Sequence, residues 1–553
     1  AIKLAAAIRR TLAMDVSLAQ VFELKTVAGL AARMGQQVSI VIPHIELARY
    51  PLSFAQERML FIEQFEQGTD AYHIPYLMLL DEGVRLSVLE SAINQVAERH
   101  SVLKMVYRSG GDQAYQQPIT EPLAFKTQFL ESVEILWQIL RTELATPFNL
   151  TTEPGLRLRH YQVGHSHYLL FMWHHIAIDG WSVDIFMHEL AEAYHARLEK
   201  RDSRLPALEI TYGDYAHWQR EYLRGEVGER QRAYWQQALA GYEPLLLPTD
   251  HPRPVQVDYQ GRNFGFTLGS KLTGQLKALA KQQETTLYTV LLSGFYLMLA
   301  RLSGQSDIVL GTPTDNRHHA QTQPLIGMFV NSLVLRAQVE QTGSVERLIE
   351  HVHDVIAQAK AHQDIPFEQL VDALQVERDA SRHPVFQVLF GLQDAGKTLQ
   401  TATDLPFSPV QLDDSLYSPA KFDLSLFIAE DASCLTGVIN YAVSLFDETT
   451  IARMAAGYQQ VLTAFVADPQ QPLSRLDVLS AQERHTLLSG WNQTDRPCPS
   501  ENTLSQQFEA QAAATPDNAA LEFAGETLTY RQLNERANQL AAVIRAQYQQ
   551  QCQ

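Results

Sequence analysis

The sequence predicts a mixed α/β protein with at least two globular units. The chain has 553 residues, of which 46% are hydrophobic, and this is more than one ordinary domain requires. Residues 168–173 form a short continuous apolar run, which is typical of a strand buried on both faces. The second half also mixes predicted helices and strands, because an apolar helical pattern over 287–299 is followed by a strand pattern over 308–310.

Changes of pattern divide the chain into six segments. Residues 1–35 show short helical patterns that are too small to enclose a core, so we expect a remnant of a larger helical domain cut from a longer chain. A linker follows over residues 36–50. Two lobes then cover residues 51–225 and 226–480. A second linker covers 481–502, and the start of a further unit covers 503–553. Within the first lobe, Ser87 and Glu90 have the spacing of a capping box, which predicts a helix that begins after Ser87.

Bulk properties narrow the class of function. The formal net charge is −18, so no basic stripe is available and a nucleic-acid partner is not expected. Cys434, Cys498 and Cys552 are widely spaced, which favours neither a disulfide framework nor a zinc site and fits a reducing cytoplasmic location. The longest apolar run, 287–299, is too short for a membrane span and is predicted to be a buried helix.

The feature with the clearest chemical meaning is the run from His174 to Gly180, which reads HHIAIDG. It lies where the apolar strand ends and a helical pattern begins. Adjacent residues of a strand point to opposite faces, so only one of the two histidines can face a given cavity. We choose His175, because an imidazole can accept a proton from an attacking amine or hydroxyl near neutral pH. Asp179 is assigned to ion pairing, and Gly180 leaves room for a ligand close to the backbone.

Two other interpretations of this run remain open from the residues alone. Paired histidines at a strand end can be structural groups with satisfied hydrogen bonds. A metal site requires a third ligand, and no third ligand lies at a fitting spacing, so no metal is expected.

Taken with six further motifs, the run resembles the HHxxxDG signature of condensation domains from nonribosomal peptide synthetases, which are similar in fold to chloramphenicol acetyltransferase. The other motifs occur in the family's order, with Lys104 replacing a usual Arg and Ser332 replacing a usual Thr. They are Ser53–Arg58 (SxAQxR), Arg99–Lys104 (RHxxLR), Tyr212–Ala216 (YxDYA), Ile326–Ser332 (IGxFVNT), His362–Glu368 (HQDxPFE) and Arg378–Phe386 (RDxSRxPxF). The resemblance covers about residues 51–480 and implies two acetyltransferase-like lobes in a V-shaped pseudo-dimer.

The flanking segments carry resemblances of their own. Residues 1–35 resemble the C-terminal part of a peptidyl carrier domain, whose phosphopantetheine-bearing serine would lie before Ala1. Residues 503–553 resemble the beginning of an adenylation domain without its phosphate loop, so no ATP is expected at this site. The implied partners are an upstream and a downstream carrier, which present thioesters on 4′-phosphopantetheine, and the adenylation domain of the same module. Neither nucleic acid nor a membrane is implied.

The resemblance also implies roles for particular residues. His175 is the principal catalytic residue, as a general base or as a positioning group, and His174, Asp179 and Gly180 complete the catalytic motif, with the Gly180 N–H as an oxyanion donor. Residues implied to line the substrate channel or to support it structurally are Trp181, Ser182, Arg317, Arg58 and Asn331. Asp179 is expected to pair with Arg317, with Arg58 as the alternative, although the residues before Arg317 depart from the commoner small-residue version.

The implied activity is amide-bond formation between a carrier-bound donor and a carrier-bound aminoacyl acceptor, as in antibiotic and other secondary-metabolite biosynthesis. An L-donor and L-acceptor type is favoured, because a carrier directly precedes the domain and no second histidine motif is evident near residue 70. The alternatives are a dual epimerisation/condensation domain and an inactive condensation-like domain that recruits a partner enzyme. An epimerisation domain, a heterocyclisation domain and a stand-alone acyltransferase fit the motifs or the flanks less well.

Overall fold

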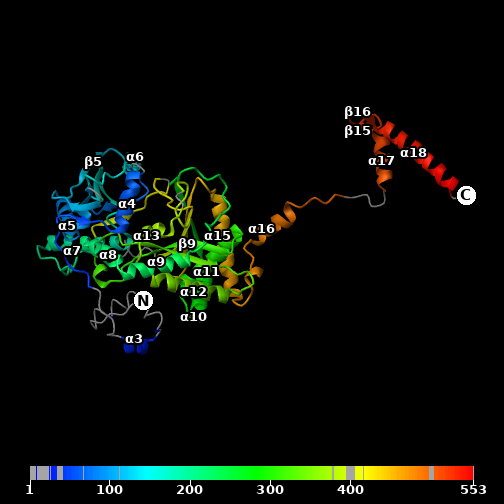
Figure 1. Cartoon of the computed structure of the whole chain (residues 1–553). Coiled ribbons are helices and arrows are strands. Elements are labelled where there is room, and N and C mark those ends of the chain that lie inside the picture. The colour runs from blue at the N-terminus through cyan, green and yellow to red at the C-terminus, as the bar shows by residue number, and fades with distance from the viewer. Residues whose placement is uncertain are drawn as a thin grey trace. The chain divides into compact units, whose positions relative to one another are not determined.

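The computed structural model describes residues 8, 24, 26–33, 41–65, 68–110, 113–376, 379–393, 405–414, 416–431, 433–496 and 503–551. The chain separates into two compact units, Ala1–Ser480 and Ala481–Gln553 (Figure 1). Most of the 1–35 segment lies outside the described residues, apart from a short helix α3 over Val27–Arg33. Arg378, Cys498 and Cys552 also lie outside them.

The first lobe is built on a five-stranded sheet with the order β12-β2-β7-β6-β5. The apolar run at 168–173 lies in the central strand β7, and its side chains from Leu169 onward are buried, which confirms the strand prediction. The five strands cover Phe407–Val410, His73–Leu80, Ser166–His174, Leu156–Val163 and Lys126–Leu130. A small sheet adds β1 (Tyr50–Pro51), β4 (Gln113–Pro118) and β3 (Met105–Gly110). The helices of this lobe are α4 (Phe54–Phe65), α5 (Leu86–Arg99), α6 (Val133–Leu144), α7 (Gly180–Glu199) and α8 (Tyr212–Arg224).

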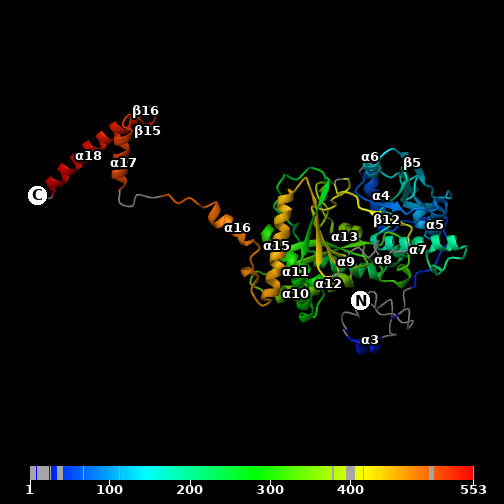
Figure 2. The same ribbon diagram turned by 180° about the vertical axis from the view of Figure 1, so that it is seen from behind.

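The second lobe repeats the same kind of architecture around a six-stranded sheet. The sheet order is β10-β9-β11-β13-β14-β8. These strands cover Asn331–Gln338, Asp307–Thr314, Val388–Gln393, Leu424–Glu430, Leu435–Ala442 and Gly261–Leu268. Its helices are α9 (Glu226–Ala238), α10 (Ser270–Gln282), α11 (Leu287–Ser303), α12 (Val345–Ala361), α13 (Phe367–Leu374) and α15 (Glu448–Ala467). The helices α10, α11, α12 and α15 lie close together in both views (Figures 1 and 2), and α11 contributes twelve buried residues to the core, as its apolar run predicts.

Two segments of the second lobe pack in the first lobe. Strand β12 comes from the later part of the chain, yet it pairs antiparallel with β2 of the first lobe, from Phe407 opposite Leu80 to Val410 opposite Leu77. The side chains of Leu325, Ile326 and Phe329 are likewise buried in the first lobe's core. The boundaries 51–225 and 226–480 therefore do not describe where these later segments pack. Local patterns missed this packing because β12 is only four residues long and lies within residues 392–420, which are rich in Asp, Ser, Thr and Pro and are predicted to be loops.

The capping-box prediction at Ser87 was wrong. Helix α5 begins at Leu86 and its N-cap is Arg85, with no capping hydrogen bond from a side chain in the described part of the chain. The carboxylate of Glu90 instead accepts a hydrogen bond from the backbone N–H of Phe125 at 2.9 Å. The Glu90 carboxylate, which a capping box would have used at the start of the helix, is therefore bound by a residue farther along the chain.

The unit Ala481–Gln553 contains α16 (Ala481–His485), α17 (Leu504–Ala514), a hairpin of β15 (Ala519–Phe523) and β16 (Glu526–Thr529), and α18 (Tyr530–Gln551). Among its described residues only Ala512 is buried among the hydrophobic side chains, while Leu504 and Phe523 are exposed. In the part of the chain that the structure describes, no single helix is both long and apolar enough to cross a bilayer; only the bent pair α10 and α11 passes that test together.

Candidate active site between the two lobes

The HHIAIDG run forms the connection between β7 and α7. Strand β7 ends at His174, where the backbone N–H donates to the carbonyl of Gly155 at 2.9 Å. The N–H of His175 donates to the carbonyl of Tyr72 at 2.9 Å, so the loop leaves the sheet with a fixed direction. Helix α7 begins at Gly180, and Asp179 is its N-cap.

His174 points into the first lobe's core. Its side chain is fully buried, with Nε2 at 2.9 Å from Glu63 Oε1. Its Nδ1 accepts a hydrogen bond from the N–H of Ile176 at 3.0 Å, which places the ring proton on Nε2. Both nitrogens are therefore used internally, and His174 supports the loop instead of reaching a ligand.

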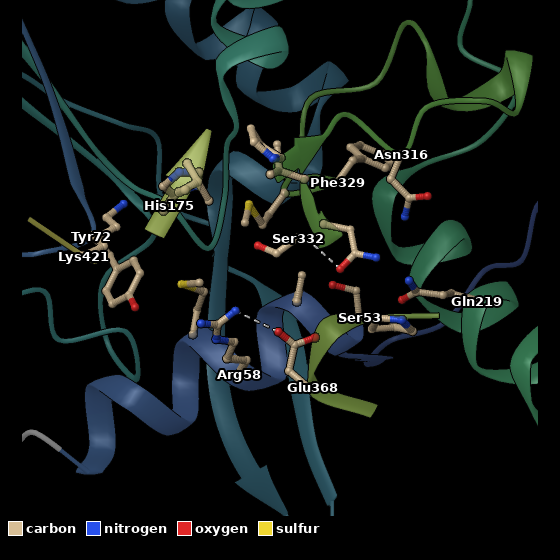
Figure 3. A pocket seen from close by; sticks show the side chains of 18 of the residues that line it. Ser53, Arg58, Tyr72, His175, Gln219, Asn316, Phe329, Ser332, Glu368 and Lys421 are labelled. Atoms are coloured by element: carbon tan, nitrogen blue, oxygen red, sulfur yellow. Dashed lines mark hydrogen bonds and ion pairs between the residues drawn. The ribbon is translucent and has the colours of Figure 1, made fainter. Parts of the chain in front are cut away.

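His175 faces the opposite way, as the alternation of a strand requires. It is half-buried and lines a cavity between the lobes, where Figure 3 shows it on the same side as Tyr72 and Lys421. Its Nδ1 is buried and has no hydrogen-bond partner among the described residues. Burial, helped by the charge of Lys421, lowers the pKa of His175 to about 3. The imidazole is therefore neutral at physiological pH and can accept a hydrogen bond.

Asp179 is a buried structural carboxylate. Its Oδ1 accepts from the N–H of Ser182 at 2.9 Å and lies 2.7 Å from Ser182 Oγ. Its Oδ2 accepts from the N–H of Phe329 at 3.0 Å. The guanidinium of Arg317 pairs with it at 3.1 Å, and both side chains are 0% exposed.

Arg317, and not Arg58, is therefore the ion-pair partner of Asp179. Its Nη1 also donates to the carbonyls of Thr322 and Leu325, each at 2.7 Å, and its guanidinium carbon lies 4.0 Å from the Phe329 ring centroid. The pair joins α7 of the first lobe to the loop after β9 of the second lobe. The pair is fully buried, and Asp179 also accepts hydrogen bonds from backbone N–H groups of both lobes, although Arg317 Nε has no partner among the described residues.

Arg58 has a different position. It extends from α4 into the cavity, where Nη1 donates to Glu368 Oε1 at 3.1 Å and Nη2 lies 2.9 Å from His383 Nε2. Figure 3 shows this pair between Arg58 and Glu368 at the edge of the space that His175 faces. Arg58 thus connects the lobes at a second point, on the cavity wall.

Of the other predicted site residues, one lines the cavity and the rest lie outside it. Asn331 lines the cavity, but its amide donates to the carbonyls of Gln363 and Ile365 and accepts from two backbone N–H groups, so its polar atoms are occupied. Ser182 is buried behind the cavity, where its Oγ accepts from Arg317 at 2.7 Å. Trp181 is 37% exposed and donates to the Gln323 carbonyl at 3.2 Å. Gly180 is exposed, with open space where a Cβ would lie.

The cavity has a volume of about 170 Å³ and is lined by both lobes. This is smaller than the range of about 300–1,000 Å³ that encloses a drug-sized ligand, so a narrow passage fits it better than a closed pocket. Sequence reasoning gave no role to several of its charged or aromatic side chains: Tyr72, Glu368, His383 and Lys421. Glu368 and His383 lie inside matched motifs, whereas Lys421 follows a segment that reads as a loop and carried no signal.

The loop that carries Phe329 is closely packed, which gives a stability prediction for Gly327. A Cβ at Gly327 would lie 2.0 Å from the buried Tyr212 ring. We expect Gly327→Ala to lower the free energy of unfolding by about 1–3 kcal/mol, because an extra methyl group forces the ring or the loop to move. Chemical denaturation measures the free energy of unfolding. Gly274→Ala is the control, since a Cβ at Gly274 on helix α10 meets no atom of the described residues within 4 Å. Equal stability of the two variants would contradict the packing argument.

Among the described residues, no group of three or more His, Cys, Asp or Glu side chains is placed to hold a metal ion.

The fold and the site define a two-lobed α/β protein with a histidine-bearing cavity between its lobes. The chain belongs to the condensation domain family, whose model matches residues 46–488. This family catalyses amide-bond formation, an acyl transfer, in nonribosomal peptide synthetases.

Among curated proteins, the chain is 36% identical over 550 residues to tyrocidine synthase 3 of Brevibacillus parabrevis. It is 34% identical over 543 residues to surfactin synthase subunit 1 of Bacillus subtilis (strain 168). Each match covers 97% of this chain but only 8% and 15% of those proteins, so the chain corresponds to a small part of each.

Solved structures share the fold at lower identity. A four-domain nonribosomal peptide synthetase, holo-AB3403 bound to AMP and glycine, matches with a TM-score of 0.77 and 22% identity, over 93% of this chain and 40% of that one. The X-domain in complex with OxyB from teicoplanin biosynthesis matches with a TM-score of 0.73 and 24% identity, over 81% of this chain and all of that one. These likenesses support the two-lobed fold.

Proposed function

We propose that this chain joins an L-configured donor, held as a thioester on an upstream carrier, to an L-aminoacyl acceptor on a downstream carrier. The observation that carries the proposal is the position of His175, which presents a neutral imidazole to a cavity lined by both lobes. Nonribosomal peptide synthetases use carrier domains with phosphopantetheine arms, and a narrow passage suits a long thin arm that brings its thioester to His175.

In this proposal, holding both arms in one cavity supplies much of the rate. Fixing an amine next to a thioester makes the reaction effectively intramolecular, and effective molarities of about 10⁵ M or more are reached when the geometry is good. The amine nitrogen attacks the thioester carbonyl, a tetrahedral intermediate forms, and the carbon–sulfur bond then breaks.

His175 orients the attacking amine. An imidazole with a pKa of about 3 is a weak base, so a positioning role fits it better than proton abstraction. Because Nδ1 is buried and the ring lines the cavity, Nε2 is the ring nitrogen left to accept an N–H of the amine. The role of the Gly180 N–H as an oxyanion donor stays a prediction, because Gly180 is not among the residues that line the cavity.

The proposal is tested by a single-turnover assay with intact-protein mass spectrometry. An upstream carrier loaded with an L-aminoacyl or L-peptidyl group is mixed with this chain and a downstream carrier loaded with an L-aminoacyl group. We expect the donor to appear on the downstream carrier as an amide. No transfer with several matched donors would overturn the proposal and favour the recruitment alternative, in which the domain docks a partner enzyme.

The same assay gives a prediction about stereochemistry. We expect L-donors to transfer at least about tenfold faster than their D-epimers, because a misplaced reacting group in a preorganised site loses one or more factors of ten in rate. The comparison uses one donor residue in both configurations on the same carrier. A preference for the D-donor, or epimerised product from an L-donor, would replace the L-type assignment with the dual epimerisation/condensation type.

A further inference from the structure

Lys421 is a charged group of the cavity that has no carboxylate partner among the described residues. It lies between β12 and β13 and is half-buried. Its ammonium lies 4.7 Å from the ring centroid of Tyr72, a residue of the first lobe, and it takes part in none of the ion pairs formed in the described part of the chain. Arg58, the other cation on the cavity wall, is neutralised by Glu368. Among the described residues of the cavity, Lys421 is therefore a cation without a neutralising carboxylate.

The backbone around Lys421 is firmly held. The N–H of Ala420 donates to the carbonyl of Tyr259 at 2.9 Å, and the carboxylate of Asp423 forms an ion pair with Arg253. The ring of Phe422 stacks on that of Phe386 with centroids 5.3 Å apart and an interplanar angle of 25°. The second lobe thus places Lys421 at the interface with the first lobe.

Lys421 lies close to the residue proposed to orient the amine. Its charge is the second cause, after burial, that lowers the pKa of His175. Burial, with a smaller effect from the charge of Arg58, lowers the pKa of Lys421 itself to about 8. The side chain consequently exchanges a proton in the pH range where thiols and amines also do. The titratable and charged groups that line the cavity together with Lys421 are Arg58, Tyr72, His175, Tyr215, Glu368 and His383.

We propose that Lys421 is the electrostatic partner and proton donor of the departing thiolate, a role that rests on the proposed function. As the carbon–nitrogen bond forms, negative charge develops on the thioester oxygen, and the ammonium stabilises it. When the carbon–sulfur bond breaks, Lys421 gives one proton to the sulfur and a thiol leaves. The amine of Lys421 then takes up the proton that the new amide nitrogen loses, so the enzyme returns to its starting state.

The test compares Lys421→Met and Lys421→Arg in the single-turnover assay. We expect Lys421→Met to lower the transfer rate by about 100-fold, the usual effect of losing one such stabilising group. Lys421→Arg keeps the charge but does not release its proton near neutral pH. We expect it to retain more activity than Lys421→Met, and to lose the fall in rate that wild type shows as the pH rises past about 8, where the ammonium of Lys421 deprotonates. Lys277→Met, which removes an exposed lysine of α10, is the control and should transfer like wild type.

A second measurement does not depend on transfer. Proton NMR of the His175 ring, assigned by comparison with His175→Ala, should show a higher His175 pKa in Lys421→Met than in wild type, because a neighbouring positive charge is removed. An unchanged His175 pKa, a Lys421→Met rate equal to wild type, or an unaltered alkaline limb in Lys421→Arg would overturn the inference while the proposed function stands. Failure of wild type to transfer any donor would instead overturn the proposed function, and this role with it.

Discussion

Replacing His175 with alanine is expected to lower the single-turnover transfer rate by about 100- to 10,000-fold while the fold stays intact. The loss follows because the His175 ring lines the cavity, where its Nε2 is the proposed acceptor for the attacking amine. The fold is expected to survive because the backbone N–H of His175, which anchors the loop on the Tyr72 carbonyl, is unaffected by the substitution. Circular dichroism and thermal melting check the fold, and mass spectrometry measures the transfer.

The neighbouring residue, His174, is expected to respond differently to the same substitution. His174→Ala removes the partner of a buried Glu63 carboxylate, so we expect a clear loss of stability along with any loss of rate. A stable His175→Ala variant with undiminished transfer would remove His175 from its role and leave the function in place. A His175→Ala variant that also melts at a much lower temperature than wild type would assign the residue to structure.

The pH dependence separates a positioning role from a basic one. With a pKa of about 3, His175 stays neutral at every pH above about 4, so its titration should leave no limb near pH 6.5 in the rate profile. A limb at that pH that disappears in His175→Ala would show that the ring titrates in its ordinary range, which would remove the argument against a basic role.

Local sequence rules correctly predicted that His174 and His175 point in opposite directions. Strand alternation separates His174 from His175, and the structure turns the first toward Glu63 and the second toward the cavity. The pairing of Asp179 with Arg317 came from family resemblance, since the two residues are far apart in the chain and no local pattern connects them. The resemblance was therefore the stronger guide to contacts between the lobes.

Local sequence patterns could not predict that segments of the second lobe pack in the first lobe. Strand β12 is too short to show a period, and its pairing with β2 depends on a partner more than three hundred residues earlier in the chain. Lys421 becomes visible for the same reason, since it reaches Tyr72 and His175 only because the chain returns from β12 to the second lobe there. A lysine next to a loop is ordinary in a sequence, and only the assembled cavity shows that Lys421 has no carboxylate partner among the residues that the structure describes.

Loss of the buried ion pair between Asp179 and Arg317 is expected to have a large effect on stability. Arg317→Met should lower the free energy of unfolding by about 3–5 kcal/mol, because it leaves a buried carboxylate without its cation. The carbonyls of Thr322 and Leu325 lose their donor at the same time, which adds to the cost. Chemical denaturation measures the change, and Arg224→Met is the control, because the ion pair of Arg224 with Glu221 is exposed and should contribute little.

A double substitution distinguishes the ion pair from the packing around it. If the charge pair dominates, Asp179→Asn combined with Arg317→Met should be less destabilised than the sum of the two single variants, since neither charge is then left alone. Additive effects would instead assign the loss to the other contacts of Arg317, such as its packing on Phe329. Because this pair joins α7 to the loop after β9, a dominant charge pair would also mean that the position of His175 depends on both lobes staying together.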